Sequence, residues 1–139
     1  MQTRCIKAEY IWLDGAEPVQ QLRSKSKIIS LDPSSSEPVS LTTFEEWGFD
    51  GSSTFQATGH DSDLTLVPCA FYPDPLRSGE SYFVLCEVNT PDNRPHASNS
   101  RAALRGLLQR CQASHDPWAG FEQEYTLLDQ ERRPFGADA

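Results

Sequence analysis

The periodicity of the apolar residues changes once along the chain, near residue 99, and this change limits the fold more than any other feature. Before that point, segments that favour strands are short and bounded by turn residues. After it, apolar residues recur at helical spacing. Strands followed by a helix predict the α+β class, and 139 residues suffice for one ordinary domain or a small domain plus a piece of another.

The first strands are predicted to form a hairpin. Residues 8–13 (AEYIWL) are rich in strand-forming side chains and stop at the turn pair Asp14-Gly15. Residues 22–31 alternate well enough to form the partner strand. Two prolines and four serines over residues 32–40 then indicate a surface loop.

Two further strands are predicted over residues 64–67 and 81–88, the second internal to the sheet because its middle is continuously apolar. A helix is predicted over residues 99–114, and a last strand over residues 120–128 (GFEQEYTLL). The apolar positions of the helix are Ala103, Leu104, Leu107, Leu108 and Cys111.

The ends and outer face of this helix are also predicted. Asn99 or Ser100 is available as its N-cap. Arg101, Arg105 and Arg110 are expected on the face turned away from the sheet.

Charge and cysteine content exclude several classes of partner. Twelve basic and twenty acidic residues give a net charge of −8, which argues against nucleic acid or an anionic membrane as a partner, and no apolar run approaches a membrane span. The four cysteines have no zinc-binding spacing. We interpret them as reduced thiols of a cytoplasmic protein, with a disulfide as the alternative.

Glu122 and Glu124 are the first candidate for chemistry, because alternate residues of a strand share one face. The neighbouring aromatic residues Trp118, Phe121 and Tyr125 predict partial burial. A partly buried pair of carboxylates requires a cation, and oxygen ligands suit Mg²⁺ or Mn²⁺. The alternative is an exposed sheet edge with two solvated acids.

The second candidate is the segment WGFDGSST, in which the turn pair Asp50-Gly51 is followed by three hydroxyl side chains. Two aromatic residues before the turn could anchor it, so that Asp50 is held outward as a fixed negative charge for a small cation or amine. The alternative is a tight loop in which Ser52 and Ser53 satisfy backbone amides.

Other familiar chemistries lack support. The three histidines lie in separate polar segments without a nucleophile at a recognisable spacing, which argues against a hydrolytic triad. The glycines near residue 50 fit neither of the two common phosphate-binding loops.

Taken together, these segments resemble the N-terminal part of a glutamine synthetase of the eukaryotic-type (type II) branch. The match runs in order through most of the chain, and its most specific pieces are FDGSS at residues 49–53 and FEQEYTL at residues 121–127. Further matching pieces are YIWLDG (10–15), LRSK (22–25), LCEV (85–88), Arg94-Pro95 and PFG (134–136).

The resemblance implies an ATP-dependent ligase that makes glutamine from glutamate and ammonium through γ-glutamyl phosphate. It implies a homo-oligomeric ring with active sites between adjacent subunits. It also implies a β-grasp-like N-terminal domain over residues 1–97, followed over residues 98–139 by the incomplete beginning of the catalytic domain, with one helix and one strand.

The same resemblance implies roles for the candidate residues. Glu122 and Glu124 match two metal-binding glutamates, and Glu122 also lies where the family contacts ATP. Asp50, with Ser53 beside it, matches the loop that reaches the adjacent subunit's site, attracts ammonium and helps to deprotonate it. These roles suit a reaction between two anions, because phosphoryl transfer needs charge neutralisation and ammonium must lose a proton before it attacks.

The chain stops at Ala139, where the family pattern would continue through most of the catalytic domain. We therefore expect the isolated chain to be inactive as a synthetase. One alternative is a non-catalytic β-grasp module that docks at glutamine synthetase subunit interfaces, and another is an unrelated acidic metal-binding domain. A reading frame that continues past Ala139 would favour the ligase fragment, whereas a stop codon there would favour the module.

Overall fold

The computed structural model describes residues 3–34 and 37–136, and these form five strands, two short 3-10 helices and one α-helix. The chain divides into two compact units, Met1–Leu107 and Leu108–Ala139, of which the first contains the whole sheet. The elements are β1 (Arg4–Leu13), β2 (Leu22–Leu31), η1 (Leu41–Thr43), β3 (Trp47–Asp50), η2 (Gly51–Thr54), β4 (Asp63–Pro73), β5 (Ser81–Asn89) and α1 (Ser100–His115).

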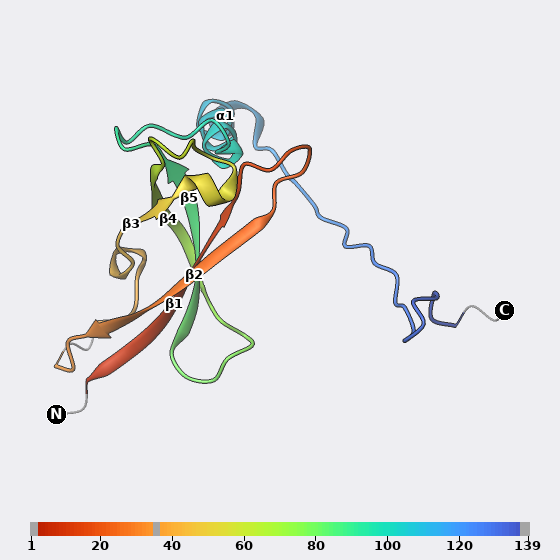
Figure 1. The fold of residues 1–139 in the computed structure, drawn as a ribbon, viewed down its shortest axis with the longest axis horizontal. Coiled ribbons are helices and arrows are strands. Elements are labelled where there is room, and N and C mark those ends of the chain that lie inside the picture. Colours follow the sequence, from red (N-terminus) through yellow and green to blue (C-terminus); the bar gives the residue numbers. More distant parts are fainter. Residues whose placement is uncertain (1–2, 35–36, 137–139) are drawn as a thin grey trace. The chain divides into compact units, whose positions relative to one another are not determined.

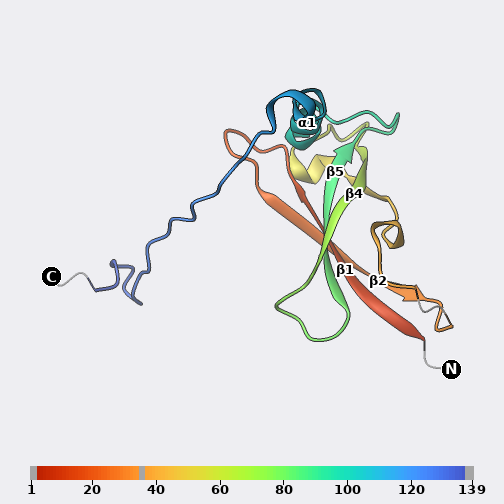
Figure 2. The same cartoon turned by 180° about the vertical axis from the view of Figure 1, so that it is seen from behind.

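The five strands form one mixed sheet in the order β2-β1-β5-β4-β3. β1 and β5 are parallel, and all other neighbours are antiparallel. Figures 1 and 2 show the long strands crossing at a steep angle, so the sheet is strongly twisted. The predicted hairpin is confirmed, because β1 pairs with β2 from Arg4↔Leu31 to Leu13↔Leu22.

One face of the sheet forms the core. β1 alternates strictly, so that its even-numbered side chains from Ile6 to Trp12 are buried while their neighbours are partly or fully exposed. The other strands of the centre supply matching side chains. The buried apolar set is Ile6, Ala8, Tyr10, Trp12, Phe44, Leu64, Leu66, Val84, Cys86 and Val88.

Three strands differ from the prediction, and the first of them, β1, begins at Arg4, four residues before the predicted start at residue 8. The segment that we expected to be only a loop contains the four-residue strand β3, which pairs with the start of β4. β4 itself runs to Pro73, six residues beyond the predicted end at residue 67. β3 is too short for the alternation of its side chains to predict a strand. In β4, a β-bulge between Pro68 and Ala70 interrupts the alternation.

The predicted helix is confirmed as α1, and Asn99 is its N-cap. The Asn99 Oδ1 atom accepts a hydrogen bond from the backbone N–H of Ala102 at 3.1 Å, and its Nδ2 donates to the Val88 carbonyl at 3.0 Å. One side chain therefore starts the helix and ties it to β5.

The prediction that Arg101 and Arg105 face away from the sheet is wrong. Both approach the carboxylate of Glu87 on β5, with N···O distances of 3.5 Å and 2.8 Å respectively. Glu87 is only 4% exposed, so the buried charge draws the two arginines toward the sheet. Leu104 and Leu107, which the periodicity assigns to the buried face, are exposed instead.

The prediction of a strand over residues 120–128 is also wrong. The segment has no strand, and its one β-bridge joins Leu128 to Pro134. A strand requires a neighbour to satisfy its backbone groups, and the described residues provide none there. Phe121 is 100% exposed, so the expected partial burial is absent as well.

Candidate functional site

The turn that follows β3 holds Asp50 by local hydrogen bonds. Asp50 is the last residue of β3 and precedes the 3-10 helix η2. Its Oδ1 atom accepts a hydrogen bond from the Ser52 backbone N–H at 2.8 Å, and the Ser53 hydroxyl donates to the Asp50 carbonyl at 3.1 Å. The carboxylate therefore caps η2. The tight loop of the alternative also forms, with the Ser53 hydroxyl bonded to a backbone carbonyl and not to an amide N–H.

Gly51 and the aromatic residues of β3 make this turn rigid. A Cβ atom added to Gly51 would lie 2.5 Å from Leu64 Cδ1. The backbone N–H of Gly51 donates a hydrogen bond to the Ser62 carbonyl at 2.8 Å. Phe49 packs on Trp12 with ring centroids 5.0 Å apart. The prediction that aromatic residues anchor the turn is thus confirmed for Phe49.

Asp50 is exposed and ionised. Hydrogen bonds from Ser52 and then from Ser62 hold the pKa of the Asp50 carboxyl below its ordinary value. Among the described residues, none forms an ion pair with it. The turn therefore presents an oriented negative charge that no described cation pairs with directly.

A shallow hollow of about 460 Å³ lies beside this turn. Two cationic side chains of β2, Arg23 and Lys25, line it together with the Asp50 turn. Both cations lie in the matching piece LRSK (22–25), which carried no predicted role. Their positions at alternate residues of a predicted strand place them on one face. The remaining lining residues are Trp12, Ser24, Phe49, Ser53 and Thr54.

Glu122 and Glu124 belong to the second unit, Leu108–Ala139. Both are exposed, and neither has a hydrogen-bond or ion-pair partner among the residues that the structure describes. Their carboxylate oxygens are the type of ligand that Mg²⁺ and Mn²⁺ take. The donor type fits these ions, but the described residues bring together no group of three or more side chains able to hold one.

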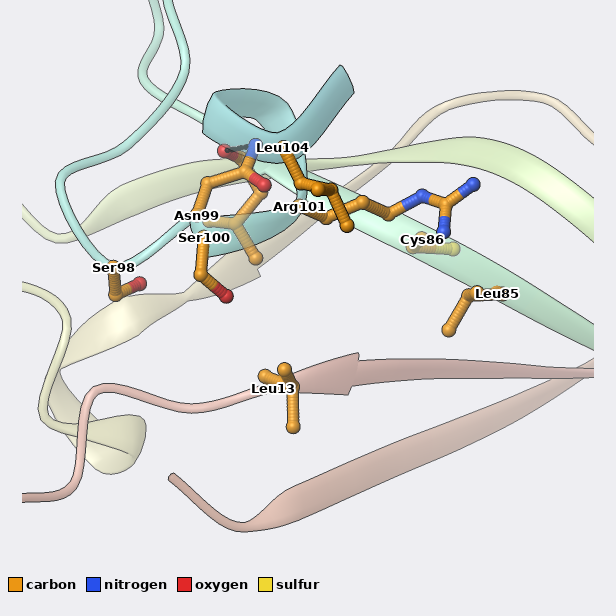
Figure 3. A pocket seen from close by; sticks show the side chains of 9 residues that line it. Leu13, Leu85, Cys86, Ser98, Asn99, Ser100, Arg101 and Leu104 are labelled. Atoms are coloured by element: carbon orange, nitrogen blue, oxygen red, sulfur yellow. Dashed lines mark hydrogen bonds between the residues drawn. The ribbon is translucent and has the colours of Figure 1, made fainter. Parts of the chain in front are cut away.

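An apolar hollow lies where the end of β1, β5 and the first turns of α1 meet (Figure 3). Its volume is about 470 Å³. Leu13, Leu85 and Leu104 point into the space between these elements, and the start of α1 adds Arg101 (Figure 3). No sequence pattern predicted this hollow, because it is built from elements that are far apart in the chain.

All four cysteines are free thiols, as we interpreted them. Cys86 is buried in the core, and this burial raises the pKa of its thiol to about 12.

Within the part of the chain that the structure describes, α1 is too short and too polar to cross a membrane.

Comparisons with known proteins agree with one another. A family model described as glutamine synthetase, beta-Grasp domain, matches residues 5–91. The chain is 52% identical over 130 residues to a protein named glutamine synthetase from Streptomyces viridochromogenes, covering 94% of this chain and 36% of that protein. It is also 52% identical over 131 residues to one from Streptomyces hygroscopicus, with coverages of 94% and 35%.

A more distant relative extends the similarity to animals. The protein named glutamine synthetase 1, mitochondrial, from Drosophila melanogaster is 42% identical over 132 residues, which cover 94% of this chain and 31% of that protein. The chain thus spans about a third of the length of these curated relatives.

Proposed function

The chain belongs to the glutamine synthetase family, of which it carries the N-terminal portion, and we propose that this portion serves an ATP-dependent ligase. The ligase joins ammonia to glutamate through γ-glutamyl phosphate. Residues 1–97 form the β-grasp domain in this proposal, and residues 98–139 begin the catalytic domain. The subunits form a ring in the cytoplasm, with each active site shared by two adjacent subunits.

The Asp50 turn is the observation that best supports this proposal. An exposed carboxylate with a lowered pKa, which forms no ion pair with any residue that the structure describes, can attract ammonium. Because the turn is held by Ser52 and packed through Gly51, the carboxylate need not reorganise when the cation arrives. Asp50 then accepts a proton from ammonium, and Ser53 keeps the turn in shape.

Glu122 and Glu124 are proposed as metal ligands, with Glu122 also lying near ATP. When bound, Mg²⁺ or Mn²⁺ would neutralise charge on the phosphate oxygens. The two glutamates are only part of such a shell, since this chain gathers no third ligand around them in the described residues. The chain's own contribution is therefore two oxygen donors separated by one glutamine.

The proposal can be tested by joining residues 1–139 to the remaining part of the Streptomyces viridochromogenes relative. We expect the fusion to form γ-glutamyl hydroxamate from glutamate, hydroxylamine and ATP with Mn²⁺. Asp50→Asn should lower kcat/KM for ammonium by about 100-fold, as expected for loss of a general base. The deficit should shrink as pH rises, because more of the ammonia is already deprotonated.

Asp61→Asn is the matched control, because Asp61 is an exposed carboxylate outside the Asp50 turn. It should leave kcat/KM for ammonium within about twofold. An equal loss in both variants would contradict the assigned role of Asp50. Glu122→Gln in the same fusion should raise the Mn²⁺ concentration needed for half-maximal activity.

The 139-residue chain alone should be inactive, because it supplies about a third of the length of its relatives. Significant hydroxamate formation by the purified chain would contradict this expectation. A second candidate function is a non-catalytic module that docks at glutamine synthetase subunit interfaces, which the exposed Asp50 turn on the edge strand β3 favours. Under that alternative, adding the chain to an intact relative should change its activity, whereas under the first proposal it should not.

A further inference from the structure

The two edge strands of the sheet, β2 and β3, meet over its core face although three strands separate them in the sheet order. Tyr10 on β1 contacts Trp47 on β3 edge to face, with ring centroids 5.3 Å apart and an interplanar angle of 78°. Lys25, the partner of Tyr10 in the register with β2, lies over the same ring of Trp47. The twist of the sheet therefore brings a lysine from one edge onto the opposite edge.

Lys25 makes two contacts with β3. Its Nζ atom lies 3.6 Å from the centroid of the Trp47 ring, within the range of a cation–π interaction. The same atom donates a hydrogen bond to the Gly48 carbonyl at 2.6 Å. Partial burial lowers the pKa of the Lys25 ammonium, with a smaller contribution from the charge of Lys27, in agreement with an ammonium drawn out of water.

These contacts matter because β3, although its aromatic side chains pack on the core, has few sheet hydrogen bonds of its own. It has only four residues and pairs in the sheet with β4 alone. A short edge strand has few ladder hydrogen bonds, so one further tie is a large share of its restraint. Gly48 lies two residues before Asp50, and the tie therefore acts at the base of the Asp50 turn.

Lys27 provides an internal comparison. It lies on the same strand and face as Lys25 and carries the same charge. Its Nζ is 5.2 Å from the Tyr10 and Trp47 ring centroids, and within the described residues it donates no hydrogen bond to β3. The two lysines thus differ in the tie to the Gly48 carbonyl.

We infer that Lys25 is a positioning residue: it ties β2 to β3 through Trp47 and Gly48 and so fixes the direction in which the Asp50 carboxylate points. The assignment rests on the proposed function of Asp50 for its consequence in catalysis. The contact of Lys25 with Trp47 and Gly48 does not rest on that function. It can be measured in the 139-residue chain without an enzyme assay.

The first experiment is amide hydrogen exchange, followed by NMR, on the purified chain and on Lys25→Met, Lys25→Arg and Lys27→Met. The backbone amides of Gly51 and Ser52 report on the turn, since the first donates to Ser62 and the second to Asp50. Lys25→Met should speed their exchange by about tenfold, the effect of losing one charge-assisted hydrogen bond and one cation–π contact. Lys25→Arg keeps a donor and a cation over Trp47, and should restore slow exchange.

Lys27→Met should leave these two amides within about twofold of the unsubstituted chain. The inference is overturned if Lys25→Met leaves them unchanged, if Lys27→Met has the same effect, or if Lys25→Met accelerates exchange throughout β1 and β5. The last result would mean that Lys25 supports the whole sheet and not the turn.

The second experiment uses the fusion described above. Lys25→Met should raise KM for ammonium several-fold while leaving KM for ATP and glutamate unchanged, and Lys25→Arg should recover most of the loss. If Lys25→Met speeds exchange at Ser52 but leaves KM for ammonium unchanged, the contact between β2 and β3 is supported. Its role in positioning Asp50 for the ligase is then overturned. An inactive fusion would count against the proposed function while the exchange data still decide whether the tie exists.

Discussion

At the scale of single residues, Asp14 holds the turn that closes the β1–β2 hairpin. Its side chain is fully buried and accepts hydrogen bonds from the backbone N–H groups of Ala16 at 3.0 Å and Gln21 at 2.8 Å. Its second oxygen accepts one from Arg23 Nε at 2.9 Å. The hydrogen bond from Gln21 is the largest of several contacts that hold the pKa of the Asp14 carboxyl below its ordinary value.

We predict that Asp14→Asn lowers the free energy of unfolding by about 2 kcal/mol at neutral pH, because the amide cannot satisfy both backbone donors and the arginine. Since the folded-state pKa is lowered, the contribution of the carboxylate is complete above about pH 4 and is lost as the pH falls through the folded value. The difference in the free energy of unfolding between the unsubstituted chain and Asp14→Asn should therefore become smaller in acid. Urea unfolding over a pH series measures it, with Asp61→Asn as an exposed control.

The thiols offer a second residue-scale prediction. Cys86 is buried with a pKa of about 12, whereas Cys5 is exposed. Because the thiolate is the reactive form, iodoacetamide at about pH 8 should modify Cys5 first and Cys86 only after unfolding. Mass spectrometry of the labelled peptides distinguishes the two sites. Equal labelling of both in the folded chain would show that the core around Cys86 opens readily.

At the scale of elements, one buried carboxylate strengthens the contact between α1 and β5 that the Asn99 cap begins. Glu87 accepts a hydrogen bond from Arg105 at 2.8 Å, while Arg101 lies 3.5 Å away. The arginines are about half exposed and can be hydrated when unpaired, but Glu87 cannot. Loss of the arginine should therefore cost more than a surface ion pair would.

Arg105→Gln should lower the free energy of unfolding by about 1–2 kcal/mol. The substitution leaves the buried Glu87 carboxylate with only the 3.5 Å contact to Arg101. Arg110→Gln is the matched control: Arg110 is exposed on the same helix and has no ion pair among the described residues. Denaturant unfolding followed by far-UV circular dichroism compares them. Similar free energies of unfolding for Arg105→Gln and Arg110→Gln would contradict a structural role for the ion pair between Arg105 and Glu87.

At the scale of the whole molecule, the two units should respond differently to protease. The segment between α1 and Leu128 forms no helix or strand, and its aromatic residues Trp118, Phe121 and Tyr125 are exposed. Proteases require an accessible stretch of backbone, which the sheet does not offer. Chymotrypsin should therefore cut first within residues 118–125 and leave the sheet intact. An earlier cut at Phe55 or Tyr72, which are exposed but lie within or beside the sheet elements, would contradict this.

Sequence alone determined those features whose causes lie within a few residues of one another. The hairpin follows from alternation around Asp14-Gly15, the helix and its N-cap from the spacing after Asn99, and the exposed Asp50 from the turn residues beside it. The family motifs added the β-grasp fold, which the comparisons confirm. These local signals need no knowledge of which strands become neighbours.

Only the tertiary structure decided which distant groups meet. Arg101 and Arg105 turn toward β5 because Glu87 is buried there, and Lys25 reaches Gly48 because the sheet twists its two edges together. Residues 120–128 have a strand-like pattern but form no strand, because a strand is completed by hydrogen bonds to a neighbour that a sequence pattern cannot supply.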